Sequence, residues 1–185
     1  MIYVALLRGI NVGGKNKINM KQLKQAFEQA GMTQVITYIN SGNIIFASEL
    51  PQHELPAILQ RKILEAFSLE IPVMIRNLIE ITAVIEALPE DWTNDDQMKS
   101  DVLFLWDTID DSSIIEQLPL QPNMGTVHYI PGAVLLSIPR EHAAQSGMNK
   151  LVSSKLYRYM TIRNVNTTRE IYRLMQLILN DSVNL

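Results

Sequence analysis

Residues 35–47 spell VITYINSGNIIFA, in which two runs of β-favouring residues flank a short polar turn. The runs cover Val35–Ile39 and Ile44–Ala47, and they are rich in β-branched and aromatic side chains. Residues 40–43, NSGN, lie between them, and asparagine and glycine tolerate the positive φ angles of tight turns. We therefore predict that the two runs pair as an antiparallel hairpin.

The flanking sequence completes a recognisable element order. An apolar run, Ile2–Leu7, predicts a buried strand, and Asn19 and Gly31 carry the start and stop signals of a helix. After the hairpin, apolar residues at helical spacing over 55–67 predict a second helix, and residues 72–76 predict a short strand. The order is β-α-β-β-α-β, the ferredoxin-like pattern of an α+β fold with antiparallel sheets.

The second half of the chain repeats this order. Residues 102–106 predict a strand, and residues 114–118 lie in a predicted helix. The arms Thr126–Ile130 and Val134–Ile138 predict a hairpin that turns at Pro131-Gly132. A predicted helix over 150–159, a strand over 161–165 and a last helix capped by Thr167 follow. The two halves share element order, but no residue-level repeat is evident.

A polar segment separates the halves. Asn77 and Glu80 predict the start of a third helix in the first half. The acidic residues that follow it predict a linker. We expect ferredoxin-like halves at residues 1–90 and 101–185, joined by residues 91–100.

Composition limits the classes of protein that the chain can represent. Its 185 residues are 47% hydrophobic, which is enough to form a core without covalent cross-links. The absence of cysteine excludes disulfides, thiolate metal ligands and a cysteine nucleophile. The first apolar run is too short for a signal peptide or a membrane span. We expect a cytoplasmic protein with no membrane partner.

Charge is distributed unevenly along the chain. Residues 1–27 contain five basic residues and no acid, whereas residues 28–139 contain four basic residues and sixteen acids. Residues 140–185 contain seven basic residues and three acids. The basic ends could form one positive face, or the helix surfaces could simply differ in charge.

The glycine-rich segment 9–16, GINVGGKN, follows the first strand and matches G-x-x-x-x-G-K. A magnesium-binding phosphate loop needs Ser or Thr next, and this chain has Asn16. The predicted hairpins also conflict with the parallel sheet of a P-loop NTPase, which we disfavour. Two interpretations stay open: a glycine-rich turn, or a loop that binds an anion in another geometry.

Residues 163–167, RNVNT, lead directly into a predicted helix N-terminus. An arginine and two asparagines there could complete an anion site, because helix N-termini favour negative charge. Alternatively, the asparagines form turns and the arginine is solvated. His53, His128 and His142 lack metal-ligand spacing, so we predict no metal site.

Five segments together resemble a bacterial family known as domain of unknown function 1697. They are residues 6–14 (LLRGINVGG), 38–43 (YINSGN), 99–102 (KSDV), 146–150 (SGMNK) and 161–167 (TIRNVNT). The resemblance implies two linked ferredoxin-like α+β halves. It implies no reaction, substrate or cofactor, and it suggests that the polar loops are the family's signature.

We expect these loops to line a site for a small ligand that bears a phosphate or carboxylate. The alternatives are a nucleic-acid-binding module that uses a basic face, or a protein-interaction module without a ligand. The acidic middle of the chain would repel a nucleic-acid backbone, so the small ligand is favoured. Whether the protein is an enzyme, its cofactors and its oligomeric state stay open. The expected ligand-binding residues are Arg8, Asn11, Lys15, Asn40, Ser41, Asn43, Lys150, Arg163, Asn164, Asn166 and Thr167.

Overall fold

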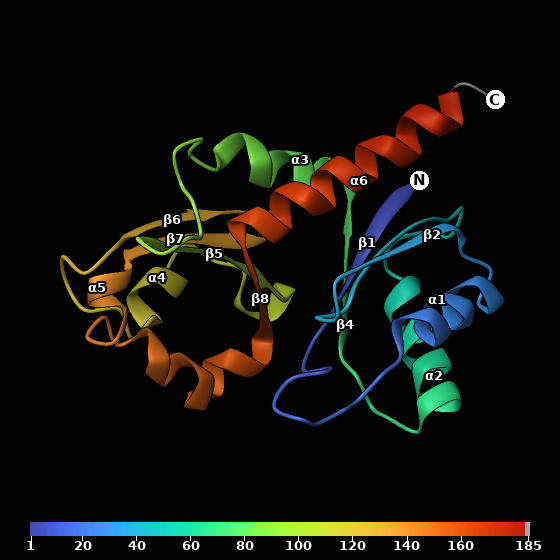
Figure 1. Cartoon of the computed structure of the whole chain (residues 1–185), viewed down its shortest axis with the longest axis horizontal. Coiled ribbons are helices and arrows are strands. Elements are labelled where there is room, and N and C mark those ends of the chain that lie inside the picture. The colour runs from blue at the N-terminus through green and yellow to red at the C-terminus, as the bar shows by residue number, and fades with distance from the viewer. Residues whose placement is uncertain (184–185) are drawn as a thin grey trace. The chain divides into compact units, whose positions relative to one another are not determined.

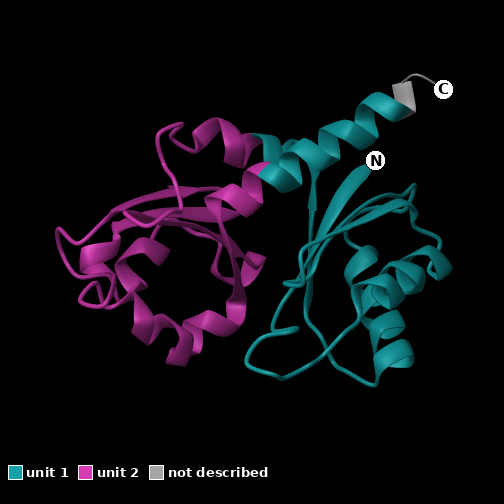
Figure 2. Cartoon of the chain, viewed as in Figure 1, with its two compact units in different colours: residues 1–82, 170–185 teal, residues 83–169 magenta. Residues whose placement is uncertain are grey.

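The computed structural model describes residues 1–183 and divides into two compact units (Figures 1 and 2). Unit 1 comprises residues 1–82 and 170–185, and unit 2 comprises residues 83–169. Each unit contains a four-stranded antiparallel sheet with helices. The predicted α+β class, with two ferredoxin-like halves, is confirmed.

Unit 1 has the element order β-α-β-β-α-β, and its sheet order is β2-β3-β1-β4. Strands β2 and β3 pair antiparallel with Ile36 opposite Ile45, as the hairpin prediction requires. The elements are β1 (Ile2–Leu7), α1 (Met20–Gln29), β2 (Thr33–Tyr38), β3 (Asn43–Ala47), α2 (Leu55–Phe67), β4 (Val73–Asn77) and α3 (Leu78–Ala87), the last of which continues into unit 2.

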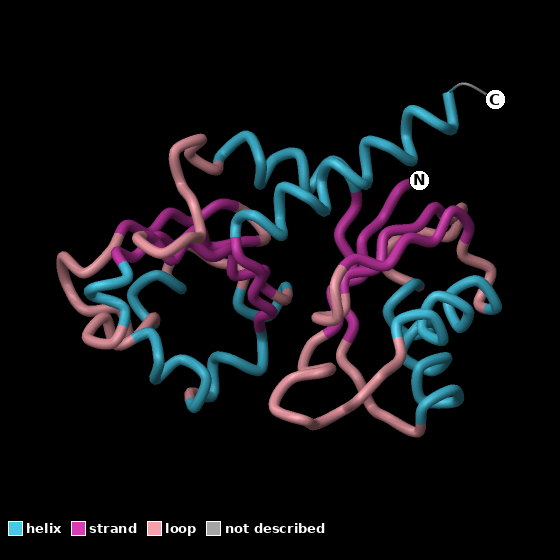
Figure 3. The backbone as a smooth tube through the Cα atoms, in the orientation of Figure 1, coloured by secondary structure: helices cyan, strands magenta, loops and turns pink. Residues whose placement is uncertain are grey.

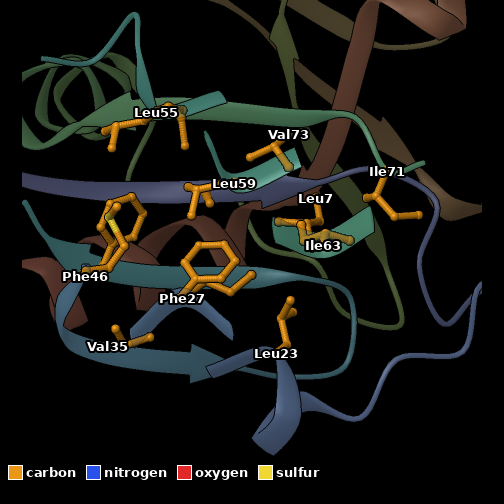
Figure 4. Close-up of a cluster of buried hydrophobic side chains, with 14 of the residues drawn as sticks. Leu7, Leu23, Phe27, Val35, Phe46, Leu55, Leu59, Ile63, Ile71 and Val73 are labelled. Carbon is orange, nitrogen blue, oxygen red and sulfur yellow. The ribbon is translucent and has the colours of Figure 1, made fainter. Parts of the chain in front are cut away.

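The core of unit 1 lies between its sheet and the helices α1 and α2 (Figure 4). Phe27 of α1 and Phe46 of β3 meet edge to face, with ring centroids 5.7 Å apart and planes at 73°. Such aromatic pairs contribute about 0.5–1.5 kcal/mol beyond the burial of their area. All six residues of β1 are buried, so both faces of this central strand are covered. This explains why its sequence is continuously apolar instead of alternating.

Unit 2 repeats the arrangement with the sheet order β6-β7-β5-β8. Its elements are β5 (Met98–Leu105), η1 (Asp107–Ile109), α4 (Ile114–Gln117), β6 (Thr126–Ile130), β7 (Ala133–Pro139), α5 (Arg140–Ala143), η2 (Met148–Ser153), η3 (Lys155–Tyr159), β8 (Met160–Asn164) and the start of α6 (Val165–Val183), whose residues from Glu170 onward belong to unit 1. The helix predicted over 150–159 is instead two short 3-10 segments, which Ser154 separates in an extended conformation.

The last helix begins three residues earlier than predicted. Helix α6 starts at Val165, and the Asn164 side-chain oxygen accepts a hydrogen bond from the Thr167 amide at 2.8 Å. Asn164 therefore caps the helix in place of Thr167. The third helix begins as predicted, because Asn77 and Glu80 each bond the other's backbone amide, at 2.7 and 3.0 Å.

A short residue-level repeat is present in both units. Residues 75–77 and 162–164 are both Ile-Arg-Asn, at the ends of β4 and β8. Each arginine is buried and donates a hydrogen bond to the carbonyl of the preceding isoleucine, at 3.0 Å for Arg76 and 2.8 Å for Arg163. Each asparagine caps the following helix. Because the repeat is only three residues long, it becomes evident only when the strands of the two units are aligned.

The units differ in extent from the halves expected at residues 1–90 and 101–185. Side chains of α6 attach the segment after α3 to unit 2: Arg169 donates to the carbonyls of Pro89 and Trp92, at 2.9 and 2.7 Å. Asn166 donates to the Asn94 carbonyl at 3.0 Å. Residues 91–97 are therefore an ordered part of unit 2, and Met98 already belongs to β5.

Candidate functional site

The longest feature of unit 1 outside its helices and strands is the loop of residues 8–19 between β1 and α1, which we name the glycine loop (Figure 3). Five of its residues have positive φ angles, among them Asn11 at 53° and Asn16 at 46°. Glycine and asparagine are the residues that adopt this conformation at least cost. The composition of the segment thus sets its backbone path.

Asn11 fixes the glycine loop through its side chain. Its amide oxygen accepts a hydrogen bond from the Ile18 N–H at 2.8 Å, and its amide nitrogen donates to the Ile18 carbonyl at 3.0 Å. The same nitrogen donates to the Asn40 carbonyl in the β2–β3 turn at 2.9 Å. Asn11 therefore closes the loop on itself and attaches it to the hairpin.

A cavity of about 390 Å³ lies beside the anchored loop. Its lining combines side-chain amides, one lysine and the start of helix α1, from residues Asn11, Gly14, Lys17, Ile18, Asn19, Met20 and Asn40. Of the described residues that line it, none carries a carboxylate. The structure thus brings together Asn11 and Asn40, two of the residues expected from the sequence.

The electrostatic character of this cavity is positive. Lys15 and Lys17 are both exposed on the glycine loop. The N-terminus of α1 reaches the cavity at Asn19 and Met20, and no acidic residue lies in the first turn of this helix. Lysine side chains and a helix N-terminus both favour a bound anion.

The equivalent loop of unit 2 has the opposite charge. Residues 106–113, WDTIDDSS, contain three aspartates and no basic residue. Asp110 accepts hydrogen bonds from the Gly132 N–H at 2.8 Å and the Tyr129 hydroxyl at 3.0 Å, so it attaches this loop to the β6–β7 hairpin. Asp110 and Asn11 therefore anchor corresponding loops, and only the loop of unit 1 is basic.

The other expected residues of unit 1 support the same frame. The half-buried Arg8 donates its backbone N–H to the Pro72 carbonyl at 3.1 Å. Asn43 is buried and donates to the Tyr38 carbonyl and the Ser41 hydroxyl, at 3.1 and 3.2 Å. Asn43 and Ser41 therefore shape the hairpin turn beside the glycine loop.

The expected residues of unit 2 take structural positions. Arg163 is 7% exposed and also donates to the Thr161 hydroxyl at 3.0 Å, and burial lowers its pKa to about 10. Asn164 caps α6, and Asn166 bonds to the segment after α3. Thr167 is buried, whereas Lys150 is exposed in η2. The burial of Arg163 contradicts the interpretation in which this arginine is solvated.

The sequence prediction of a single shared pocket joins residues of different units, and it stays a prediction. Within unit 1, the cavity also involves Gly14 and Lys17, which were missing from the expected set. Both belong to the glycine loop that the sequence singled out. Their contribution depends on the way in which the loop folds back beside α1, which the local sequence does not specify.

Comparison with known proteins gives a structural relative and a family. No curated protein matches the chain. Among the helices of the described residues, none is long and apolar enough to cross a membrane. The conserved bacterial protein SP0830 from Streptococcus pneumoniae has a similar structure, with a TM-score of 0.81 and 29% sequence identity. The alignment covers 94% of this chain and 98% of that one.

The family match confirms the resemblance seen in the sequence motifs. The model of a protein of unknown function, DUF1697, matches residues 1–135, which include the glycine loop and the β2–β3 hairpin. The chain belongs to the DUF1697 family.

Proposed function

We propose that the protein binds a small anionic ligand, bearing a phosphate or a carboxylate, in the cavity of the glycine loop. The observation that carries this proposal is the cavity of about 390 Å³ lined by Lys17, Gly14 and side-chain amides, with no carboxylate among its described lining residues. The positive charge of Lys17 attracts the anion, and the N-terminus of α1 adds a favourable partial positive charge. The Asn19 side-chain oxygen caps α1 by accepting from the Lys21 and Gln22 N–H groups, at 2.9 and 3.2 Å, so Asn19 can offer the ligand its amide donors. The Asn40 side-chain amide can donate and accept, which orients the ligand.

In this proposal Asn11 acts as a positioning residue, because its side-chain amide already bonds Ile18 and Asn40. The anchored loop presents Lys17 without first having to be ordered. A preformed loop lowers the entropic cost of binding. Of the other expected ligand residues of the loop, Arg8 is half-buried, and Lys15 is exposed and would contribute charge at longer range.

Isothermal titration calorimetry with inorganic phosphate, a sugar phosphate, a nucleoside monophosphate and citrate tests the proposal. We expect at least one of these anions to bind. Lys17→Ala should weaken that binding about tenfold, the effect of losing one charge-assisted hydrogen bond. Lys24→Ala is the matched control, because Lys24 lies on α1 within 3.8 Å of Glu28 and outside the cavity lining. Equal loss in both variants would leave only a general charge effect.

The nucleic-acid alternative predicts a different result in the same experiment. A short single-stranded oligonucleotide would then bind with an affinity that falls steeply as salt rises, because bound counterions are released. Small anions would bind weakly, and the Lys15, Lys17, Lys21 and Lys24 variants would each reduce affinity by similar factors. A protein-interaction module would bind none of these ligands.

A further inference from the structure

A second cavity, of about 430 Å³, lies within unit 2. It is framed by the segment after α3, by the starts of β5 and β6, and by the end of β7 with α5. No residue of the glycine loop contributes to it, so it is independent of the proposed anion site. Of the residues expected from the sequence to bind a ligand, none lines it.

One wall of this cavity is aromatic and preset. Trp92 lines it, and the indole stacks on the His128 ring with centroids 5.7 Å apart and planes at 23°. The Trp92 backbone is held on both sides: its N–H donates to the Pro89 carbonyl at 3.1 Å, and its carbonyl accepts from Arg169 at 2.7 Å. A half-buried indole with a fixed backbone offers a rigid stacking surface.

Close approach of two strands forms part of the cavity surface. A Cβ added at Gly125 would lie 2.7 Å from the Ser137 carbonyl oxygen and 2.8 Å from Ile138 Cγ1. Only glycine therefore fits where the chain enters β6. Met98 and Met124 also line the cavity, and thioether groups make favourable contacts with aromatic rings.

The polar groups of the cavity favour an uncharged or cationic ligand. Asp91 contributes a carboxylate, Asn123 an amide and His142 an imidazole. Of the described residues that line the cavity, none is a lysine or an arginine. This is the reverse of the glycine-loop cavity, whose lining contains a lysine and no carboxylate. A phosphate would meet repulsion from Asp91, whereas a ring with N–H donors would find acceptors.

We propose that this cavity binds a planar, uncharged heteroaromatic ring that carries hydrogen-bonding groups, of the class of a nucleobase or nucleoside. Trp92 and the methionines supply surface for stacking. Asp91 and Asn123 supply acceptors for exocyclic amino groups, and His142 can donate or accept. Stacking on an aromatic side chain tolerates different bases, so selectivity comes from the polar groups.

Tryptophan fluorescence can report this binding directly, because the chain has two tryptophans and only Trp92 lines the cavity. The Trp106→Phe variant leaves Trp92 as the single reporter. We expect adenosine or guanosine to change its emission in a saturable manner, and ribose to leave it unchanged. No saturable change with either nucleoside up to about 10 mM overturns the proposal, since stacking at a tryptophan shifts its emission.

Two cavity variants in the Trp106→Phe background give a second readout, by saturation-transfer NMR observed on the nucleoside. Trp92→Leu should weaken binding about tenfold, the usual effect of removing a stacking partner. Thr126→Tyr fills the cavity from an exposed position on edge strand β6 and should abolish the signal without removing a core residue. Circular dichroism verifies folding. If Trp92→Leu fails to fold, Thr126→Tyr decides, and unchanged binding to it overturns the proposal. Displacement of the nucleoside by inorganic phosphate would also overturn it, because an uncharged ring would not share its site with an anion.

Discussion

Replacement of Asn11 gives the sharpest test of how the glycine loop is built. Its side chain makes three hydrogen bonds to backbone groups, two with Ile18 and one with the Asn40 carbonyl, and its amide nitrogen also lies 3.9 Å from the Met20 sulfur. At about 0.5–1.5 kcal/mol each, their loss costs roughly 1.5–4.5 kcal/mol. The half-buried position favours the lower part of this range, about 2 kcal/mol, because water can replace some of the bonds.

The backbone conformation of Asn11 separates two contributions. At a φ of 53°, alanine adds about 1 kcal/mol of strain, whereas glycine adds none from its side chain. Asn11→Ala should therefore be about 1 kcal/mol less stable than Asn11→Gly. Asn11→Asp keeps the acceptor for the Ile18 N–H but places a charged oxygen near two carbonyl oxygens. We expect it to be at least as destabilising as alanine at neutral pH and milder in acid, once the carboxylate is protonated.

Two measurements examine these variants. Urea denaturation gives the free energy of unfolding, and amide hydrogen exchange at Ile18 reports local opening of the loop. We expect the Ile18 amide to exchange faster in the alanine and glycine variants, because both remove the side-chain oxygen that accepts its hydrogen bond. Equal stability of the alanine and glycine variants, or a loss below about 0.5 kcal/mol, would refute the assignment of Asn11 as the anchor.

Three further substitutions test the fold and its charges. Gly42→Ala should cost about 2–4 kcal/mol in urea denaturation, because its Cβ would lie 2.7 Å from Leu7 Cβ at a φ of +81°. Gly31→Ala, at +88° with nothing within 4 Å, is its control and should cost only about 1 kcal/mol; equal losses would contradict the steric argument. Arg163→Ala should lower the free energy of unfolding by about 2 kcal/mol or more, because it removes the hydrogen bonds to the Thr161 hydroxyl and the Ile162 carbonyl. Arg163→Met should lose less, since it keeps most of the side-chain volume, and an alanine variant as stable as the parent protein would contradict a structural role for Arg163. Burial raises the pKa of the Asp101 carboxyl above its usual value. The contribution of this group to the free energy of unfolding is therefore present in acid and is lost as pH rises through the folded-state pKa. Asp101→Asn should remove this pH-dependent loss and stabilise the protein at neutral pH, and an unchanged pH profile of thermal melts would contradict the prediction.

Local sequence signals predicted the elements that local interactions determine. The β2–β3 hairpin pairs as predicted from its turn residues, although Ile39 lies in the turn and Asn43 already belongs to β3. The cap at Asn77 and Glu80 forms because the two residues satisfy each other's backbone amides within one helical turn. Such interactions span few residues, so a short window of sequence contains all the information they need.

Features that depend on distant contacts were missed. The segment around Trp92 has no periodic pattern and resembles a linker, yet Arg169, 77 residues away in sequence, holds its carbonyl. The buried position of Arg163 likewise depends on strand β5, where it pairs with Val102. A charged residue beside a helix start predicts an exposed site, and only the tertiary fold shows that this one is buried.

Comparison of the two units indicates which parts of unit 1 serve the fold and which are left for a ligand. Both units end a strand with Ile-Arg-Asn, and both receive a central-strand N–H at a hairpin glycine, Leu7 to Gly42 at 2.8 Å and Leu105 to Gly132 at 2.9 Å. These contacts are present in both units although the loops of the units differ. They therefore serve the common fold, which we call the frame.

The first loop of each unit departs from this common frame. Asn11 and Asp110 both attach the loop to the following hairpin, so the anchoring role is common to both units. What differs is the rest of the loop: residues 8–19 carry three basic residues and no acid, whereas residues 106–113 carry three acids and no basic residue. The frame requires neither charge, since both units form it. The fold therefore does not account for the basic charge of the glycine loop, and the proposed anion would.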